Sequence, residues 1–232
     1  MTNRMINLAL DIIFPSYCLG CSKYLKNGET LCPDCLLKIS INKTLFCGKC
    51  HARLPENKKI CHLDFPYLLG AAASYRDETV KELIHNLKFK SIKKSAVPLS
   101  KILIKYLKGV DMNLENYSVI PIPLGKNRFR TRGFNQAELL AKEISQYFNL
   151  PAALNVLIRS KETLPQTELK SFEDRFKNLE DSFLIANPEI ITNKNILLID
   201  DVSTSGATLN AAAAALKKSG AKKIIAIVAA LA

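Results

Sequence analysis

One segment of fourteen residues, at positions 196–209, limits the possible folds of this chain more than any other part of it. Its sequence is ILLIDDVSTSGATL. The apolar residues at 196–199 predict a buried strand, and Asp200 and Asp201 follow at its end. A small polar loop leads into a helical run at 209–218. Such a series is typical of α/β folds and can bind anions, because unpaired N–H groups and the helix dipole point to one place.

The residue types in this segment suit a phosphorylated sugar. Gly206 lets the backbone approach a phosphate, and nearby hydroxyls can donate to it, namely those of Thr204, Ser205 and Thr208. The two carboxylates can accept hydrogen bonds from paired sugar hydroxyls or hold Mg²⁺ through water. No Lys follows the glycine and no G-x-G-x-x-G is present, which excludes both common nucleotide signatures. The alternative is an ordinary turn whose acids only cap the helix, although adjacent buried carboxylates are costly without a partner.

The segment resembles the 5-phosphoribosyl-1-pyrophosphate (PRPP) motif of type I phosphoribosyltransferases. The resemblance implies that the two acids hold the ribose 2′- and 3′-hydroxyls and that the loop cradles the 5′-phosphate. It also implies that Mg²⁺ accompanies the ligand. The PRPP-binding residues expected on this basis are Asp200, Asp201, Val202, Ser203, Thr204, Ser205, Gly206, Ala207 and Thr208.

All seven cysteines lie near the N-terminus, and their spacing repeats. Adding 29 to the positions of Cys18, Cys21 and Cys32 gives three further cysteines, and the eighth position of the repeat holds Asp64 in place of a cysteine. Each C-x2-C pair supplies two thiolates on a tight turn, and two such pairs close a tetrahedral Zn²⁺ site. The first set is complete and predicts a zinc ion bound by Cys18, Cys21, Cys32 and Cys35. Disulfides are the alternative, which a reducing cytosol disfavours.

The second set has only three thiols, from Cys47, Cys50 and Cys61. Asp64, His62 or His51 could complete a second zinc site, and a ribbon held by packing alone is the alternative. Residues 15–64 thus resemble a double zinc ribbon. A segment so short, with few large apolar residues, needs such a metal to stay folded.

Composition restricts the partners and the location of the chain. It has 232 residues, 33 basic and 21 acidic, with a formal net charge of +12, which favours anionic partners such as phosphorylated metabolites or nucleic acid. No run of 18 apolar residues is present, so no membrane span is expected. The apolar start is interrupted by Asp11, which predicts a short amphipathic helix packed on the protein and argues against a signal peptide. We therefore expect a cytoplasmic protein.

A basic segment follows a second predicted strand. Residues 118–123 read as this strand, and the loop expected at 124–136 carries four cations, Lys126, Arg128, Arg130 and Arg132. Four cations after a strand end can hold a pyrophosphate or a nucleic-acid backbone. A solvated basic loop is the alternative.

Alternation of strands and helices predicts an α/β fold with a parallel sheet flanked by helices. The strands are expected at 68–75, 118–123, 153–158, 196–200 and 223–229. We expect residues 1–66 to form the N-terminal helix and the zinc ribbons, and residues 67–232 to form the phosphoribosyltransferase-like domain. Ligands in such sheets bind at the carboxyl ends of strands, so the basic loop and the acidic segment can meet in one crevice.

Further motifs resemble the ComF family, which joins a zinc ribbon to a type I phosphoribosyltransferase domain. They are RGFNQAELLA at 132–141, LKF at 87–89, the strand and loop at 119–124, and a spaced pattern from Arg159 to Phe183. The resemblance implies a role in natural competence and a mobile loop over the active site, for which the polar residues 160–182 are the candidate.

Two classes of function follow. The chain is either a PRPP-binding protein of DNA uptake, with single-stranded DNA and a helicase-like protein as partners, or an active transferase that moves ribose 5-phosphate from PRPP to a nitrogenous base. A scaffold with neither activity is the third option. The sequence identifies no general base and no acceptor pocket.

Overall fold

The structure is a computed structural model that describes residues 15–26, 28–55, 61–160 and 182–232. Two expectations fall outside these residues. They are the N-terminal amphipathic helix, expected before residue 15, and nearly all of the loop expected to cover the site at 160–182. No helix in the described ranges is long and apolar enough to cross a membrane.

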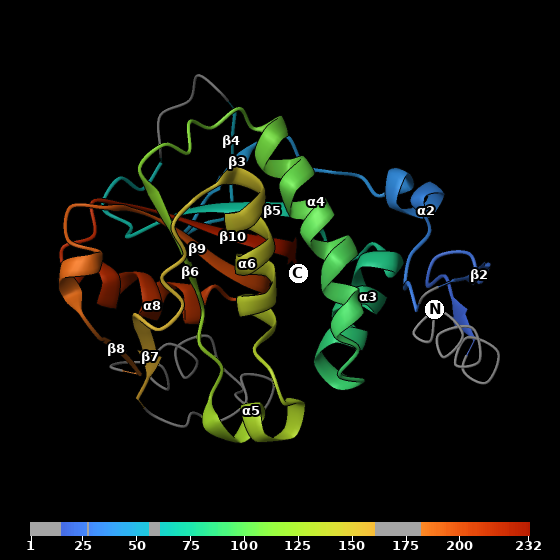
Figure 1. Cartoon of the computed structure of the whole chain (residues 1–232). Coiled ribbons are helices and arrows are strands. Elements are labelled where there is room, and N and C mark those ends of the chain that lie inside the picture. Colours follow the sequence, from blue (N-terminus) through green and yellow to red (C-terminus); the bar gives the residue numbers. More distant parts are fainter. Residues whose placement is uncertain (1–14, 27, 56–60, 161–181) are drawn as a thin grey trace.

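A six-stranded sheet forms the centre of the molecule (Figure 1), in the order β4-β3-β5-β10-β9-β6. The last four run parallel to one another, whereas β3 is antiparallel to both of its neighbours. The two inner strands β9 and β10 are almost entirely buried, as expected for parallel strands covered on both faces. The strands are β3 (Leu45–Cys47), β4 (Arg53–Leu54), β5 (Leu68–Ser74), β6 (Tyr117–Pro121), β9 (Asn195–Ser203) and β10 (Lys223–Leu231).

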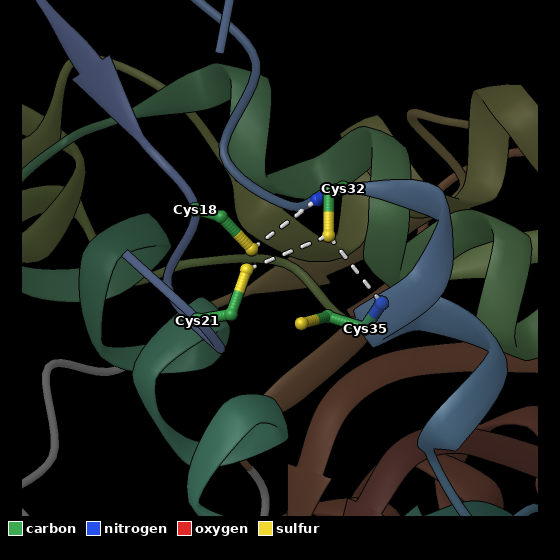
Figure 2. A group of neighbouring side chains, drawn as sticks. All are labelled: Cys18, Cys21, Cys32 and Cys35. Carbon is green, nitrogen blue, oxygen red and sulfur yellow. Dashed lines mark hydrogen bonds between the residues drawn. The ribbon is translucent and has the colours of Figure 1, made fainter. Parts of the chain in front are cut away.

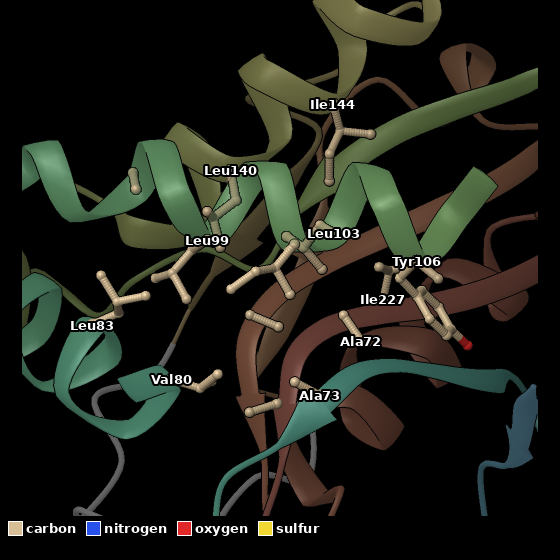
Figure 3. Close-up of a cluster of buried hydrophobic side chains, with 14 of the residues drawn as sticks. Ala72, Ala73, Val80, Leu83, Leu99, Leu103, Tyr106, Leu140, Ile144 and Ile227 are labelled. Atoms are coloured by element: carbon tan, nitrogen blue, oxygen red, sulfur yellow. The ribbon is translucent and has the colours of Figure 1, made fainter. Parts of the chain in front are cut away.

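Helices cover both faces of this sheet. On one face lie α3 (Glu78–Phe89), the short 3₁₀ helix η1 (Lys93–Ser95), α4 (Ala96–Gly109) and α6 (Gln136–Phe148). Figure 3 shows side chains of α3 and α4 near the alanines of β5, with Leu140 and Ile144 of α6 beside α4. The other face is covered by α8 (Ala207–Lys218), whose Leu209 and Leu216 are fully buried. Alternate residues of β9 therefore serve two cores, as the two-residue period of a strand requires.

The cysteine-rich segment is divided between two places. Its first half forms β1 (Ser16–Tyr17), β2 (Tyr24–Leu25) and α2 (Pro33–Lys38), which lie beyond α3 and α4 in Figure 1. Its second half contributes β3 and β4 to the central sheet, with Cys47 paired to Leu68. The sheet thus runs across the domain boundary expected after residue 66.

The strand expected at 153–158 is wrong as a member of the parallel sheet. Only an isolated bridge joins Ala152 to Val119, since a turn at 154–155 ends the pairing. Further along, β7 (Leu157–Arg159) pairs with β8 (Phe183–Ile185) in a separate antiparallel sheet, and η3 (Pro188–Ile190) precedes β9. The parallel sheet expected from the sequence is otherwise confirmed.

Candidate functional site

The acidic segment sits at the end of β9 and turns tightly into α8. The strand continues to Ser203, three residues beyond the expected end, and only residues 204–206 separate it from the helix. Gly206 adopts a left-handed conformation with φ 73°, which an L side chain rarely takes. Its carbonyl accepts the first helical hydrogen bond from Asn210, at 2.8 Å. The first turn of α8 therefore follows the two acids closely in the chain, and the N–H of Ala207 in this turn donates to Oγ of Ser205 at 3.4 Å.

The acid pair is held by a lysine from another helix. Asp201 is buried at 3 % exposure, and its Oδ1 lies 2.8 Å from Nζ of Lys88 in the last turn of α3. The N–H of Asp201 donates to Oδ1 of Asp200, at 2.8 Å. Burial and the charge of Asp201 raise the pKa of Asp200 to about 7, against the opposing effect of Lys88. Without a ligand, Asp200 and Asp201 therefore have too little positive charge and too few hydrogen-bond donors around them to stabilise both carboxylates in the ionised form.

The four predicted cations lie on a helix, so the expectation of a loop was wrong. Residues Lys126–Arg132 form α5, which begins after Gly125 and ends at Gly133. Gly133 has φ 75° and donates its N–H to the Phe129 carbonyl at 2.8 Å, a left-handed helix end. Cations four residues apart now share a face: Arg128 and Arg132 line a cleft, whereas Lys126 and Arg130 are exposed.

Arg132 connects this helix to the acids. Its guanidinium lies 5.7 Å from the centre of the Phe89 ring. Burial lowers the pKa of Arg132, and the charges of Asp201 and Asp200 oppose that shift. Arg132 therefore stands within electrostatic reach of both carboxylates, next to the LKF element that carries Lys88.

The rest of the RGFNQ motif fixes this corner of the chain. Asn135 accepts from the Ala137 N–H at 3.1 Å and so caps α6, while its amide donates to the Ile122 carbonyl at 2.9 Å. Phe134 is buried, with Nζ of Lys93 5.2 Å above its ring. The Asn135 amide thus attaches the start of α6 to the residue after β6, and the Phe134 ring attaches the turn between α5 and α6 to η1.

A cleft of about 610 Å³ joins these elements. Of the expected PRPP-binding residues it is lined by Asp200, Asp201, Val202, Thr204 and Thr208, but not by Ser203, Ser205, Gly206 or Ala207. Several lining residues were not predicted as site residues, namely Lys88, Phe89, Asn127, Asn135, Gln136 and Arg159. The LKF motif at 87–89 was the one sequence signal for Lys88 and Phe89. The basic segment at 124–136 and the acidic segment at 200–208 therefore contribute residues to the same cleft.

The first cysteine set forms a compact cluster, and Figure 2 shows its four side chains converging. The sulfur atoms of Cys21 and Cys32 are 3.8 Å apart. A tetrahedral zinc ion with bonds of about 2.3 Å to sulfur requires sulfur separations of about 3.8 Å. The Cys18 sulfur accepts from the Cys32 N–H, and the Cys32 sulfur accepts from the Cys35 N–H, both at 3.4 Å. The cluster thus fits a zinc ion with thiolate ligands.

The thiol groups of this cluster influence one another strongly. Burial disfavours the Cys18 thiolate, but N–H donors of Cys32, Gly20 and Cys21 outweigh it and lower the pKa of Cys18 to about 6. Burial and the neighbouring thiols raise the pKa of Cys35 to about 12. Four sulfurs so close together cannot all ionise unless a cation joins them, which is what Zn²⁺ supplies.

The second set also forms a cluster, and its fourth member is His62. The ligating atoms of Cys47, Cys50, Cys61 and His62 lie within 4.8 Å of one another. The Cys47 sulfur is 3.3 Å from Nδ1 of His62, and the sulfurs of Cys50 and Cys61 are 3.5 Å apart. Among the three candidates for the fourth ligand, the structure brings His62 into the cluster and leaves Asp64 out. A set of three thiols and one imidazole is a common structural zinc site.

Known families match both parts of the chain. Residues 9–63 match the double zinc ribbon domain, and residues 132–232 match the phosphoribosyl transferase domain. Competence protein F of Haemophilus influenzae is 29 % identical over 220 residues, which cover 90 % of this chain and 92 % of the relative. DNA utilization protein YhgH of Escherichia coli is 28 % identical over 211 residues, 89 % of this chain and 86 % of the relative.

Competence protein ComFC of Streptococcus pneumoniae is 28 % identical over 208 residues, which cover 89 % of this chain and 84 % of the relative. These similarities extend over both the ribbons and the sheet. The resemblance expected from the motifs is confirmed: the chain joins a double zinc ribbon to a phosphoribosyltransferase domain and is similar over about nine tenths of its length to Competence protein F and to ComFC.

Proposed function

We propose that the cleft binds PRPP together with Mg²⁺ and that the protein acts in the handling of DNA during uptake. Asp200 and Asp201 accept hydrogen bonds from the ribose hydroxyls. The loop and first helical turn at 204–208 hold the 5′-phosphate. Arg128 and Arg132 face the pyrophosphate. Mg²⁺, when bound, neutralises part of the pyrophosphate charge.

One observation carries this proposal: the two acids, the loop residues Thr204 and Thr208, and a pair of arginines line the same cleft. A ligand that carries a sugar between a phosphate and a pyrophosphate has groups to match all three: hydroxyls for the acids, a phosphate for the loop and a pyrophosphate for the arginines. The raised pKa of Asp200 adds support, because a carboxyl crowded by another carboxyl gains from hydroxyl donors or a cation. The ion pair of 2.8 Å with Lys88 fixes the position of the Asp201 carboxylate in the cleft.

The proposed role in DNA handling rests on the names of the relatives, which refer to competence and DNA utilization. The outward face of α5 offers a surface for single-stranded DNA. Lys126 and Arg130 are exposed there beside Phe129, which is 48 % exposed. The cations suit the phosphates of a single strand, and the exposed ring between them suits a stacked base. A helicase-like partner and a cytoplasmic location, where zinc thiolates stay reduced, complete the proposal.

An active transferase is the second candidate, and the cleft wall favours it. Phe89 is 67 % exposed and lines the cleft with Ile122 and Leu124, close to the acids. A planar base could stack there and place a nitrogen at C1 of the ribose. The new C–N bond would replace the C–O bond, and pyrophosphate would leave with the electron pair. The residues described would then act by positioning and by stabilising the leaving group. Release of pyrophosphate with a panel of bases tests this candidate.

Thermal unfolding with PRPP and Mg²⁺ tests the main proposal. Ligand at about 100 times its dissociation constant should stabilise the wild type by about 2.7 kcal/mol. The double substitution Asp200→Asn and Asp201→Asn should abolish this gain, whereas Glu143→Gln, an exposed acid on α6, should keep it. A wild type that PRPP does not stabilise would contradict the proposed function.

A further inference from the structure

Residues beside the second cysteine cluster lie near the loop at 203–208, here called the phosphate loop, although 155 positions separate His51 from Gly206. The Tyr67 hydroxyl donates to the Gly206 carbonyl at 3.5 Å. A methyl group added to Gly206 would lie 2.9 Å from the Tyr67 oxygen, 3.7 Å from Nε2 of His51 and 4.0 Å from the Gly48 carbonyl. The loop that turns into α8 is therefore packed directly against the turn between Cys47 and Cys50.

This turn is placed by the metal ligands on either side of it. Gly48 lies between Cys47 and Cys50, and His51 follows, with its N–H bonded to the Cys47 carbonyl at 3.0 Å. Gly48 itself fits so tightly that a methyl group there would clash with the Tyr67 carbonyl. A shift of the cysteines would thus move Gly48 and His51 together, and Tyr67 with them.

His51 has an unused polar atom at this contact. Its Nε2 is buried and has no hydrogen-bond partner among the residues that the structure describes. The residue also has φ 56°, a left-handed conformation that is uncommon for a side chain of this size. An unpaired buried nitrogen and a strained backbone are costly, and they persist where the surroundings hold them in place.

We propose that metal bound by the second cluster positions the phosphate loop, with His51 as the positioning residue, so that loss of this metal weakens phosphate-ligand binding. The ligand part rests on the proposed function, whereas the mechanical part concerns only the loop at 203–208. The first cluster serves as an internal comparison, because it packs elsewhere. Cys18, Cys32 and Cys35 belong to the core of α3 and α4, whereas Tyr67 and Phe46 share the core of α8.

The sequence repeat supplies a matched pair of variants. Cys21→Ser and Cys50→Ser remove equivalent, exposed ligands from the first and the second cluster, respectively. Zinc content should fall by one ion per chain in each. In Cys50→Ser, amide hydrogen exchange at 204–210 should accelerate by at least about tenfold in the ligand-free protein. In Cys21→Ser, exchange there should match that of the wild type. Equal exchange in both variants would overturn the proposal.

Ligand binding provides the second measurement. The dissociation constant for PRPP with Mg²⁺ should rise by about tenfold or more in Cys50→Ser and by less than about twofold in Cys21→Ser. If the wild type does not bind PRPP, the proposed function fails, and the exchange result still decides the coupling. If Cys50→Ser does not fold, His51→Ala replaces it, because it retains all eight ligating groups.

His51→Ala should keep the full zinc content and still accelerate exchange at 204–210. His51→Gln, which offers an amide near the position of Nε2, should return the exchange rate at 204–210 at least part of the way to that of the wild type. If His51→Ala keeps its full zinc content and its amide exchange at 204–210 equals that of the wild type, the imidazole does not position the loop.

Discussion

Single residues at the site illustrate what local sequence predicts and what it does not. The acids and the cysteines were recognisable because their chemistry depends on near neighbours in the chain. Lys88 was not, since its contact with Asp201 joins α3 to β9 across 113 positions. His62 was one of three candidates, and only the folded chain separates it from Asp64.

Replacing Lys88 should be costly for stability. Lys88→Ala would leave Asp201 as a buried carboxylate without its partner, which should lower the free energy of unfolding by about 3 kcal/mol. Lys81→Ala in the same helix is the control, because its pair with Glu78 is exposed and should contribute less than about 0.5 kcal/mol. Urea unfolding of both variants measures the difference, and similar losses would contradict the importance assigned to the buried pair.

Asp200 should make stability depend on pH. Its folded pKa of about 7 exceeds the ordinary value of 3.8, so the ionised form destabilises the fold. This penalty is absent below the unfolded pKa, grows as pH rises and is complete above the folded pKa. Asp200→Asn removes it. The stability gained should therefore be larger at pH 8 than at pH 5.5, by about 1 to 2 kcal/mol after allowing for solvent in the cleft.

Urea unfolding without Mg²⁺ or ligand measures this gain at both pH values. The range stays above the acidic conditions that strip zinc from thiolates. A gain that does not change between pH 5.5 and pH 8 would show that Asp200 titrates as an ordinary surface carboxyl.

At the scale of elements, the order of strands and helices was predictable and two details were not. The apolar runs of β9 and β10 identify buried strands. Helix α5 carries no apolar stripe from which a helical period could be read, so its basic sequence looked like a loop. The segment 153–158 has the composition of a strand, but its pairing ends after one bridge.

The helical form of α5 predicts that its cations divide into two functions. Lys126→Ala with Arg130→Ala should reduce the salt dependence of single-stranded DNA binding by about 1.4 in logarithmic slope and leave PRPP binding unchanged. Arg128→Ala with Arg132→Ala should weaken PRPP binding by at least about tenfold, because both line the cleft. Titrations of both ligands at several salt concentrations measure this, and parallel losses in the two double variants would refute the division.

At the scale of the whole molecule, the ribbons and the sheet form one structure. The repeat of 29 residues suggested two similar units, but only the second contributes strands to the central sheet. Pairing between β3 and β5 depends on contacts between distant parts of the chain, which the local spacing of cysteines does not reveal.

This arrangement predicts that the second ribbon is needed to keep the sheet domain from aggregating. A chain truncated to residues 67–232 would expose β5 as a bare edge strand and should aggregate. A chain truncated to residues 40–232 keeps β3, β4 and the second cluster, and should aggregate less than the shorter chain, although it loses the apolar residues that the first ribbon packs on α3 and α4. Size-exclusion chromatography with light scattering compares them. Aggregate-free elution of the shorter chain would mean that the edge does not require the ribbon.

Calorimetric titration with three ligands tests the central claim most directly, namely that one cleft holds both ends of PRPP. The ligands are PRPP, ribose 5-phosphate and pyrophosphate, each with Mg²⁺. If the acids, the loop and the arginines act together, PRPP should bind at least about tenfold more tightly than either fragment. Binding of PRPP no tighter than that of ribose 5-phosphate would contradict the claim, since the arginines would then contribute nothing to the ligand.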